Sequence, residues 1–303
     1  MDIHAITVTL LAPMSDHIAN GGEKLLGNAS SIKRRPDGRV YVSGQMQRHA
    51  LFSALDRLNL EDEGRGDTYV ANGDGPSTDL VRDLRSDLGG FLDTNKGDYS
   101  GRRTAPLTAT PAVASEASEV GRDLLIRIKQ DDDPDAERKQ ALATNEFSQR
   151  DLMHMSFSLD CGAVGLTKQF RYDDEKHVAT EYTKHVSDDE RKRRARLALD
   201  ATRSLTDYAN QARNATSGEP QQVLIVLDTK LSRKAARYFA PETTDAERTN
   251  LLKELDARGA LLFHGDDTTA DGDSVHEAYE KALKALDEHA LYDPSHGAEP
   301  VAA

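Results

Sequence analysis

Residues 39–55 read RVYVSGQMQRHALFSAL and join a predicted strand directly to a predicted helix. The opening RVYVSG favours a short strand. The apolar side chains that follow recur along one helical face, which predicts a helix from about Gln45 to Leu58. This stretch therefore places a Ser43–Gly44 turn between the end of a strand and the N-terminus of a helix.

This helix N-terminus has the chemistry of an anion site. The first backbone N–H groups of a helix have no partner within it, and the helix dipole is positive there, so a phosphate is favoured. Gln45, Arg48 and His49 fall in the first turns and can add side-chain donors. The basic run Lys33–Arg35 precedes the strand and can close over the same ligand. A solvated basic turn is the alternative interpretation of that run.

Outward from this stretch, the sequence predicts one elaborated α+β domain with antiparallel strands. A strand over residues 2–13 comes first, followed by a loop to Asp37. Residues 60–187 break into short pieces, including an expected helix over 77–92, and we interpret them as an insertion. The elements expected after it are a helix from a Ser187 cap with Glu190 at the capping-box position to Tyr208, a buried strand over 221–228, a helix over 244–258, a strand over 260–265 and a helix over 273–289.

The composition is that of a polar globular protein. Of the 303 residues, 37% are hydrophobic and 30% are charged, and there is no tryptophan. No apolar stretch approaches the roughly 20 residues of a membrane span. The N-terminus also lacks the pattern of a signal peptide, so we expect a cytoplasmic protein with no membrane partner. Cys161 is the only cysteine, which excludes an internal disulfide and a multi-thiolate metal site.

The formal net charge of -13 is unfavourable for binding a polyanion, but the charge is unevenly distributed. Between Glu23 and Arg57 there are seven basic residues and three acidic ones. The acidic runs lie elsewhere, at Asp131–Asp133, at Asp266–Asp267 and in the last sixty residues. A basic stripe near the N-terminus of an acidic molecule is therefore predicted.

Motifs for catalysis or metal binding are incomplete in this sequence. Residues 22–29 resemble a phosphate-binding loop, but Asn28 and Ala29 stand where its Lys and hydroxyl are needed. Residues 267–277 resemble a calcium loop whose last carboxylate, Glu277, comes one place early. The ten histidines form no metal-binding motif. We therefore expect neither an enzyme nor a cofactor.

Four blocks of the sequence can be read together, in this order: NGGEKLLGN with DGRVYVSGQMQRHAL, then DLGGFLDTNKGDYSGRRTAPLTATPAVA, NEFSQRDLMHMSFSLD and RKRRARLALDATRSLTDYANQAR. Together they resemble the CRISPR-associated RAMP superfamily, and specifically the DevR-like backbone subunits of type I Cascade surveillance complexes. The similarity covers most of the chain.

This resemblance implies both a fold and a function. The fold is an RRM-like (ferredoxin-like) palm made of residues 1–59 and 188–292, with helical fingers and a thumb hairpin inserted at 60–187 and a disordered tail at 293–303. The implied function is antiviral defence, in which copies line up head to tail along a guide RNA (crRNA) as a helical filament. The implied partners are the crRNA, the target DNA strand paired to it and other Cascade subunits. Because one subunit must accept every spacer, the guide is held by its backbone.

The resemblance also implies which residues bind the guide. Those that match the junction holding guide phosphates are Ser43, Gln45, Arg48 and His49. Those that match the basic loop are Lys24, Lys33 and Arg34. Arg102 and Arg103 match a paired-Arg loop near RNA or the neighbouring subunit, and Asn20 and Gly21 lie where relatives approach the backbone closely.

Two other functions remain open at this point. In type III relatives, a loop Asp of the equivalent subunit cuts target RNA, and Asp16 is the nearest candidate here. A lone carboxylate, however, needs a metal and partners that the sequence does not offer. A DNA-binding autoregulator is the other alternative.

Overall fold

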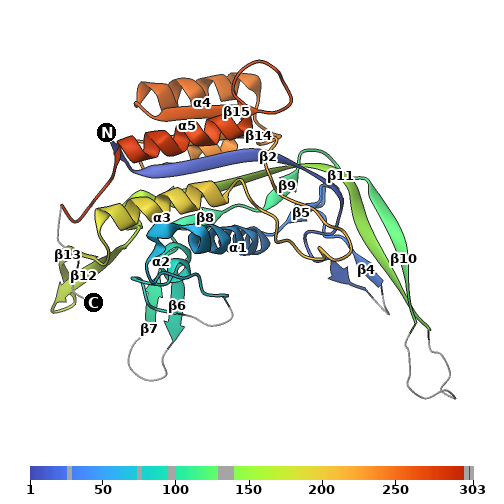
Figure 1. The fold of residues 1–303 in the computed structure, drawn as a ribbon, viewed down its shortest axis with the longest axis horizontal. Helices are drawn as coiled ribbons and strands as arrows, with labels where there is room; N and C mark the ends of the chain where they lie inside the picture. The colour runs from blue at the N-terminus through green and yellow to red at the C-terminus, as the bar shows by residue number, and fades with distance from the viewer. Residues whose placement is uncertain (26–28, 74–76, 95–99, 129–139, 297–299, 301–303) are drawn as a thin grey trace.

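The computed structural model describes residues 1–25, 29–73, 77–94, 100–128, 140–296 and 300 of the chain. A mainly antiparallel sheet runs through the middle of an elongated molecule, and strand pairs project from its ends and its lower side (Figure 1). The fold is mixed α and β, as the sequence predicts.

β2 (Ala5–His17) lies at the centre of the sheet. It pairs antiparallel with β11 (Gln140–Asp160) on one side and with β14 (Gln222–Asp228) on the other. β15 (Leu261–Asp266) pairs with the outer edge of β14. The remaining strands attach along β11 or to its neighbours, and are β3 (Glu23–Lys24), β4 (Ala29–Ser31), β5 (Tyr41–Val42), β8 (Leu107–Ala109), β9 (Ala112–Ala114) and β10 (Val120–Ile128).

Helices pack on both faces of this sheet. One face is covered by α1 (Gly44–Glu61), α3 (Asp188–Ala201) and α5 (Val275–Glu288). Because successive side chains of a strand point to opposite faces, β2 turns Ile6, Val8 and Leu10 toward these helices. Burial of each such side chain stabilises the fold by roughly 1.5–3 kcal/mol. α4 (Asp245–Ala257) and the short helix η3 (Lys234–Arg237) pack on the other face of β14.

The helix starts follow the local sequence closely. Ser187 caps α3 by accepting a hydrogen bond from the Glu190 N–H at 3.2 Å, as predicted. Thr244 and Ser274 begin α4 and α5 with complete capping boxes. The predicted end of α3 was wrong: the helix stops at Ala201, where Thr202 Oγ1 donates to the Leu199 carbonyl at 2.7 Å. The apolar pattern continues to residue 208 because Leu205 and Tyr208 are buried in the core from a loop.

The middle of the chain forms mostly strand pairs. β12 (Leu166–Asp173) pairs with β13 (Lys176–Lys184), and β6 (Phe91–Thr94) pairs with β7 (Ser100–Arg103). Outside this middle part, the short β1 (Asp2–Ile3) pairs with β16 (Ala290–Leu291). The helix expected over 77–92 is limited to α2 (Leu84–Gly89), and single turns occur at η1 (Glu63–Arg65) and η2 (Cys161–Ala163). Figure 1 shows the β10–β11 arm at one end of the molecule and the β12–β13 hairpin toward the other.

One difference from the predicted division of the chain concerns β11. This strand belongs to the segment 60–187, yet it pairs with the central strand β2, and Met153, Met155 and Phe157 lie in the main core. Part of the segment interpreted as an insertion therefore builds the middle of the sheet. No local sequence pattern indicates that β11 pairs with β2, because the pairing joins residues far apart in the sequence.

The beginning of the predicted tail is tied to the body of the protein. Asp293 accepts hydrogen bonds from Lys184 Nζ at 3.1 Å and from the Ser295 N–H and hydroxyl at 2.8 and 2.6 Å. Pro294 is buried. Residues 297–299 and 301–303, also part of the predicted disordered tail, lie outside the described residues.

We expect Asp293→Asn to lower the melting temperature at neutral pH. Burial alone would raise the pKa of Asp293, but the hydrogen bonds from Ser295 and Lys184 outweigh it and lower the pKa to about 2. The stabilisation is therefore present above the ordinary value of 3.8 and disappears as the pH falls toward about 2. Thermal unfolding between pH 2 and 7 measures this, with exposed Asp271→Asn as the control. A constant difference across that range would contradict the assignment.

Candidate nucleic-acid interface

The candidate interface is centred on the N-terminus of α1. Ser43 ends the preceding strand segment, and its hydroxyl accepts a hydrogen bond from the Met46 N–H at 3.2 Å. Gly44 fits closely beneath the sheet, because a Cβ there would lie 3.2 Å from the Ala109 carbonyl oxygen. The first turn of α1 contains no acidic residue that would offset the positive end of the helix dipole. The helix start thus keeps the character of an anion site.

A hollow of about 310 Å³ opens at this helix start. We call it the α1 hollow, and its lining residues are Asn20, Gly21, Ser43, Gln45, Met46, His49 and Ala209. Five of these were singled out from the sequence, in two segments more than twenty residues apart. The fold brings those segments together, and adds Met46 and Ala209, which no sequence pattern indicated.

Asn20 holds the basic loop in place. Its side-chain N–H groups donate to the carbonyls of Lys33 and Tyr41, both at 3.1 Å, and its carbonyl accepts from the Gly22 N–H at 3.0 Å. Gly21 follows with a φ of 75°, a left-handed backbone that favours glycine. Asn20 therefore positions the loop, while the exposed Gly21 lets the chain pass beside the hollow without a side chain.

The cations of the basic loop lie near the surface. Lys24 is exposed on β3 and Lys33 is half-buried; within the described part of the chain neither has an acidic partner. Arg34 is 43% exposed, and its guanidinium lies 3.8 Å from the Glu146 carboxylate, at the limit of an ion pair. These three side chains keep most of their charge available to a ligand.

His49 stands at the rim of the hollow beside a carboxylate. Its Nε2 lies 3.0 Å from Asp207 Oδ2, which also accepts a hydrogen bond from the Ser53 hydroxyl at 2.8 Å. Asp207 comes from the loop after α3, and it partly offsets the positive character of the helix start. A ligand that binds His49 competes with this pair.

Arg48 does not line the α1 hollow, and its role as a phosphate donor stays a prediction. Its guanidinium donates to the carbonyls of Leu107 at 3.0 Å and Gly89 at 2.7 Å, and lies 5.5 Å from the centre of the Phe52 ring. Burial, with a smaller effect of nearby Arg85, lowers the pKa of Arg48. One turn into the helix, this position faces the sheet and α2, so its donors serve the fold.

Arg48→Met is accordingly expected to destabilise the protein by about 1–3 kcal/mol, because two buried carbonyls lose their donor. The salt dependence of RNA binding should not change. Urea unfolding measures the first effect and filter binding at several salt concentrations the second. Arg65→Met, at an exposed position, is the control. If the variant instead kept its stability and its RNA affinity depended less steeply on salt, Arg48 would be a phosphate contact.

The two arginines of the predicted paired-Arg loop have different environments. Arg102 is exposed on β7 opposite Leu92, and no partner of its side chain lies among the described residues. The Arg103 side chain is only 8% exposed and forms an ion pair with Asp87. It also donates to the carbonyls of Ala163 and Leu166, both at 2.7 Å. Arg103 therefore stabilises the core, and Arg102 alone is placed to contact a ligand.

A buried polar network beneath the basic loop was missed by sequence reasoning. His17 Nε2 lies 2.7 Å from Asp151, which also accepts from Ser118, whose hydroxyl in turn accepts from the Val40 N–H. Burial would raise the pKa of Asp151, but the hydrogen bonds from His17 and Ser118 outweigh it and lower the pKa. The network links the end of the basic loop to β11.

Asp16 precedes this network with a φ of 47°, a backbone that few residues other than glycine adopt. The alternation of β2 is interrupted there, since Ser15 and Asp16 are both exposed and His17 is buried. Over the residues that the structure covers, no group of three His, Cys, Asp or Glu side chains is arranged to hold a metal. No helix in the same residues is long and apolar enough to cross a membrane.

Comparison with known proteins supports an assignment. No protein with a curated description matches the chain. The chain shares its fold with solved structures, of which two serve as examples. A chain of a "CRISPR RNA-guided surveillance complex, pre-nicking" has a TM-score of 0.56 and 10% identity, covering 93% of this chain and 100% of that one. A chain of a "CRISPR RNA-guided surveillance complex" has a TM-score of 0.53 and 14% identity, covering 93% and 99%.

A family model described as "CRISPR-associated negative auto-regulator DevR/Csa2" matches residues 26–232, which is more than half of the chain. The resemblance drawn from the four sequence blocks is thereby confirmed. The match includes the strand that leads into α1, the whole of that helix and β11. This chain belongs to the DevR/Csa2 family of CRISPR-associated proteins.

Proposed function

We propose that this protein is a crRNA-binding backbone subunit of a type I CRISPR surveillance complex and does not itself cut nucleic acid. The observation that carries the proposal is the α1 hollow, at a helix start whose first turn contains no acidic residue. Asn20, in the lining of this hollow, holds the basic loop that carries Lys24, Lys33 and Arg34. Backbone N–H groups and flexible cations recognise phosphates and not base edges. Such a site accepts any spacer, as a guide-holding subunit must.

The α1 hollow is a better RNA site than the open face of the sheet. RRM domains stack bases on aromatic side chains of that face. Here the corresponding side chains of β2 and β11 are small or polar, including Thr9, His154 and Ser156. All three are hydrogen-bonded to the Ala236 carbonyl, at 3.1 to 3.4 Å. The segment around η3 thus covers this part of the face, and these three side chains bond to protein in place of RNA.

The order of elements supports an RRM-like palm. β2, α1, β8, β11, α3 and β14 follow one another along the chain as in a ferredoxin-like β-α-β-β-α-β unit. β14, β2 and β11 are neighbours in the sheet, β8 pairs with β11, and α1 contacts α3 on one face. We assign the β6–β7 hairpin to the fingers and the β10–β11 arm to the thumb.

In the assembled complex, copies of this chain follow one another along the crRNA as a helical filament in the cytoplasm, together with other Cascade subunits. The target DNA strand pairs with the exposed guide bases. Base pairing then supplies sequence specificity for antiviral defence, while the protein holds the phosphates.

Filter binding with two guide RNAs of equal length and unrelated spacers tests this proposal. We expect equal affinities for both, with a strong decrease as the salt concentration rises. The RNA that co-purifies with the protein and its sister subunits should be a CRISPR transcript. Preference for one spacer, or retention of the protein's own promoter DNA in place of the guide, would overturn the proposal.

The RAMP ribonuclease remains the alternative because Asp16 is exposed and has a left-handed backbone, and such strained positions cluster at functional sites. Incubation of the guide-loaded protein with complementary RNA and Mg²⁺ decides between the two. We expect no cleavage. Cuts at regular intervals that Asp16→Asn abolishes would show that the chain is a nuclease.

A further inference from the structure

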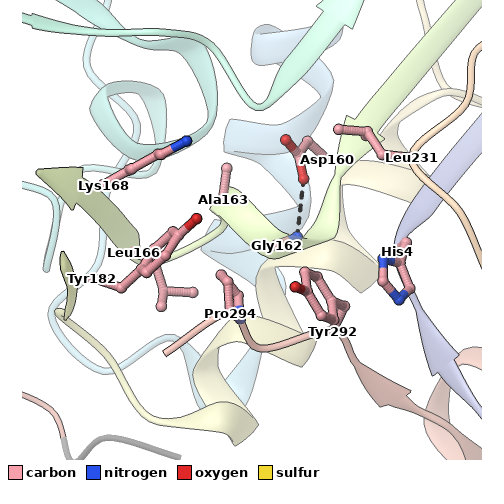
Figure 2. A pocket seen from close by; sticks show the side chains of 10 residues that line it. All are labelled: His4, Asp160, Gly162, Ala163, Leu166, Lys168, Tyr182, Leu231, Tyr292 and Pro294. Carbon is pink, nitrogen blue, oxygen red and sulfur yellow. Dashed lines mark hydrogen bonds between the residues drawn. The ribbon is translucent and has the colours of Figure 1, made fainter. Parts of the chain in front are cut away.

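A second cavity lies far from the α1 hollow, at the base of the β12–β13 hairpin. Its volume is about 280 Å³, below the range of most drug-sized ligand pockets. We call it the hairpin recess, and its lining residues are His4, Asp160, Gly162, Ala163, Leu166, Lys168, Tyr182, Leu231, Tyr292 and Pro294. Figure 2 shows side chains converging on it from both ends of the chain, from η2 and from the hairpin.

The recess contains a carboxylate without a compensating cation. Asp160 Oδ1 caps η2 by accepting from the Gly162 N–H at 3.0 Å. No cation of the described residues lies within ion-pair distance of Asp160, and Arg233 and His4 act on it from further away. Burial is the largest influence on this group and raises its pKa. A positively charged ligand would stabilise the charged carboxylate.

Aromatic groups line the rest of the recess. The rings of His4 and Tyr292 are stacked, with centroids 3.9 Å apart and planes 13° from parallel. In Figure 2 the rings of Tyr182 and Tyr292 lie on the two sides of Pro294. Neither tyrosine hydroxyl has a hydrogen-bond partner among the residues that the structure describes. The recess therefore offers flat rings and free phenolic oxygens beside a carboxylate.

An exposed aromatic surface continues from the recess along the hairpin. Phe170 and Tyr172 are 53% and 61% exposed, and both rings contact His177. Lys168, at the rim of the recess, places its ammonium 5.1 Å from the centre of the Phe170 ring. Exposed apolar side chains grouped in this way mark interaction surfaces.

The charge of the hairpin favours a protein partner over a nucleic acid. Residues 166–184 contain four basic and four acidic side chains, so the hairpin lacks the positive excess that a polyanion requires. A guanidinium suits the recess, because it is planar, stacks on aromatic faces and presents several donors to carboxylate and hydroxyl oxygens.

We propose that the hairpin recess, with Phe170 and Tyr172 beside it, is a docking site for a partner protein that inserts an arginine side chain toward Asp160. Apolar residues flanking that arginine would pack on the exposed rings. This site lies apart from the α1 hollow and does not depend on the function proposed for it.

Titration of the full-length chain, without RNA, with the blocked dipeptide acetyl-Arg-Leu-amide tests the proposal. Binding is followed through the amide NMR signals of Gly162 and Ala163. The neutral analogue acetyl-citrulline-Leu-amide and the mononucleotide UMP are the comparison probes. We expect the arginine peptide to bind at least tenfold more tightly than the citrulline peptide.

Four variants locate the interaction. Asp160→Asn keeps a capping side chain but loses the charge, and is expected to weaken arginine binding at least tenfold. Tyr182→Phe keeps the ring and should weaken binding several-fold, which preserves the test if Asp160→Asn fails to fold. Lys168→Gln removes a like charge and should not weaken binding. Asp123→Asn, on the exposed face of β10, should change nothing.

The outcomes that overturn the proposal are equally definite. Equal binding of the citrulline peptide, or unchanged binding by Asp160→Asn, would exclude recognition of a cation. Shifts with UMP and none with the arginine peptide, lost in Lys168→Gln, would identify a nucleotide site. Absence of shifts with every probe would also reject it.

Discussion

Asp87→Ala is expected to lower the free energy of unfolding by about 3–5 kcal/mol, the cost of removing one partner from a buried ion pair. Asp87 is fully buried and pairs with Arg103 and with Arg194 Nη1 at 2.7 Å. It also accepts from the Gly165 N–H at 3.0 Å. The substitution would leave the buried Arg103 without its counter-charge, and Arg194 would keep only Glu190. α2, α3 and the turn after η2 would lose the carboxylate that all three contact.

Urea unfolding of the purified chain measures this loss. Asp87→Asn is the informative second variant, because it keeps hydrogen-bond acceptors but removes the charge, and it should also be destabilising. Asp67→Ala, at an exposed carboxylate, should be nearly neutral. If Asp87→Ala lowered the free energy of unfolding by less than about 1 kcal/mol, the ion pairs of Asp87 would not be a main contact between α2 and α3.

Reversing the charges of Lys24, Lys33 and Arg34 together to Glu is expected to weaken crRNA binding roughly hundredfold at physiological salt. Each phosphate contact to a single strand releases counterions, and its loss lowers the slope of log K against log salt by about 0.7. Three lost contacts should lower the slope by about 2. Stability should change little, since these side chains are exposed or half-buried.

A matched triple variant controls for net charge. Lys230, Lys253 and Lys284 are exposed at positions away from the α1 hollow, and their reversal to Glu gives the same change in total charge. Filter binding of both proteins over a range of salt concentrations separates the effect of the basic loop from the effect of the net charge. Equal losses in the two variants would mean that the basic loop has no special role in binding the guide.

Much of the fold could be predicted where a local pattern determines it. The start of α1, the Ser187 cap, strand β14 and helices α4 and α5 follow from propensity, capping and periodicity within about fifteen residues. The role of β11 as the neighbour of β2 could not be predicted, because pairing between distant strands leaves no local signal.

The candidate site shows the same limit at the level of single side chains. Its location could be predicted, since Ser43 and Gln45 belong to a recognisable strand-to-helix junction. The direction in which an arginine points could not. Arg48 and Arg103 have the same charge as Lys33 and Arg102, but the first two have carbonyls and a carboxylate within reach inside the fold. Only the packing of α1 and β7 against their neighbours reveals that difference.

β11 is one uninterrupted strand of 21 residues, about 70 Å when extended, that runs from the middle of the sheet into the projecting arm. Bending the arm where it leaves the body would break ladder hydrogen bonds of β11 to β10 and β2. The twist of the sheet sets the direction in which the arm projects. Such an arm keeps its direction relative to the sheet as long as these strand pairs stay intact.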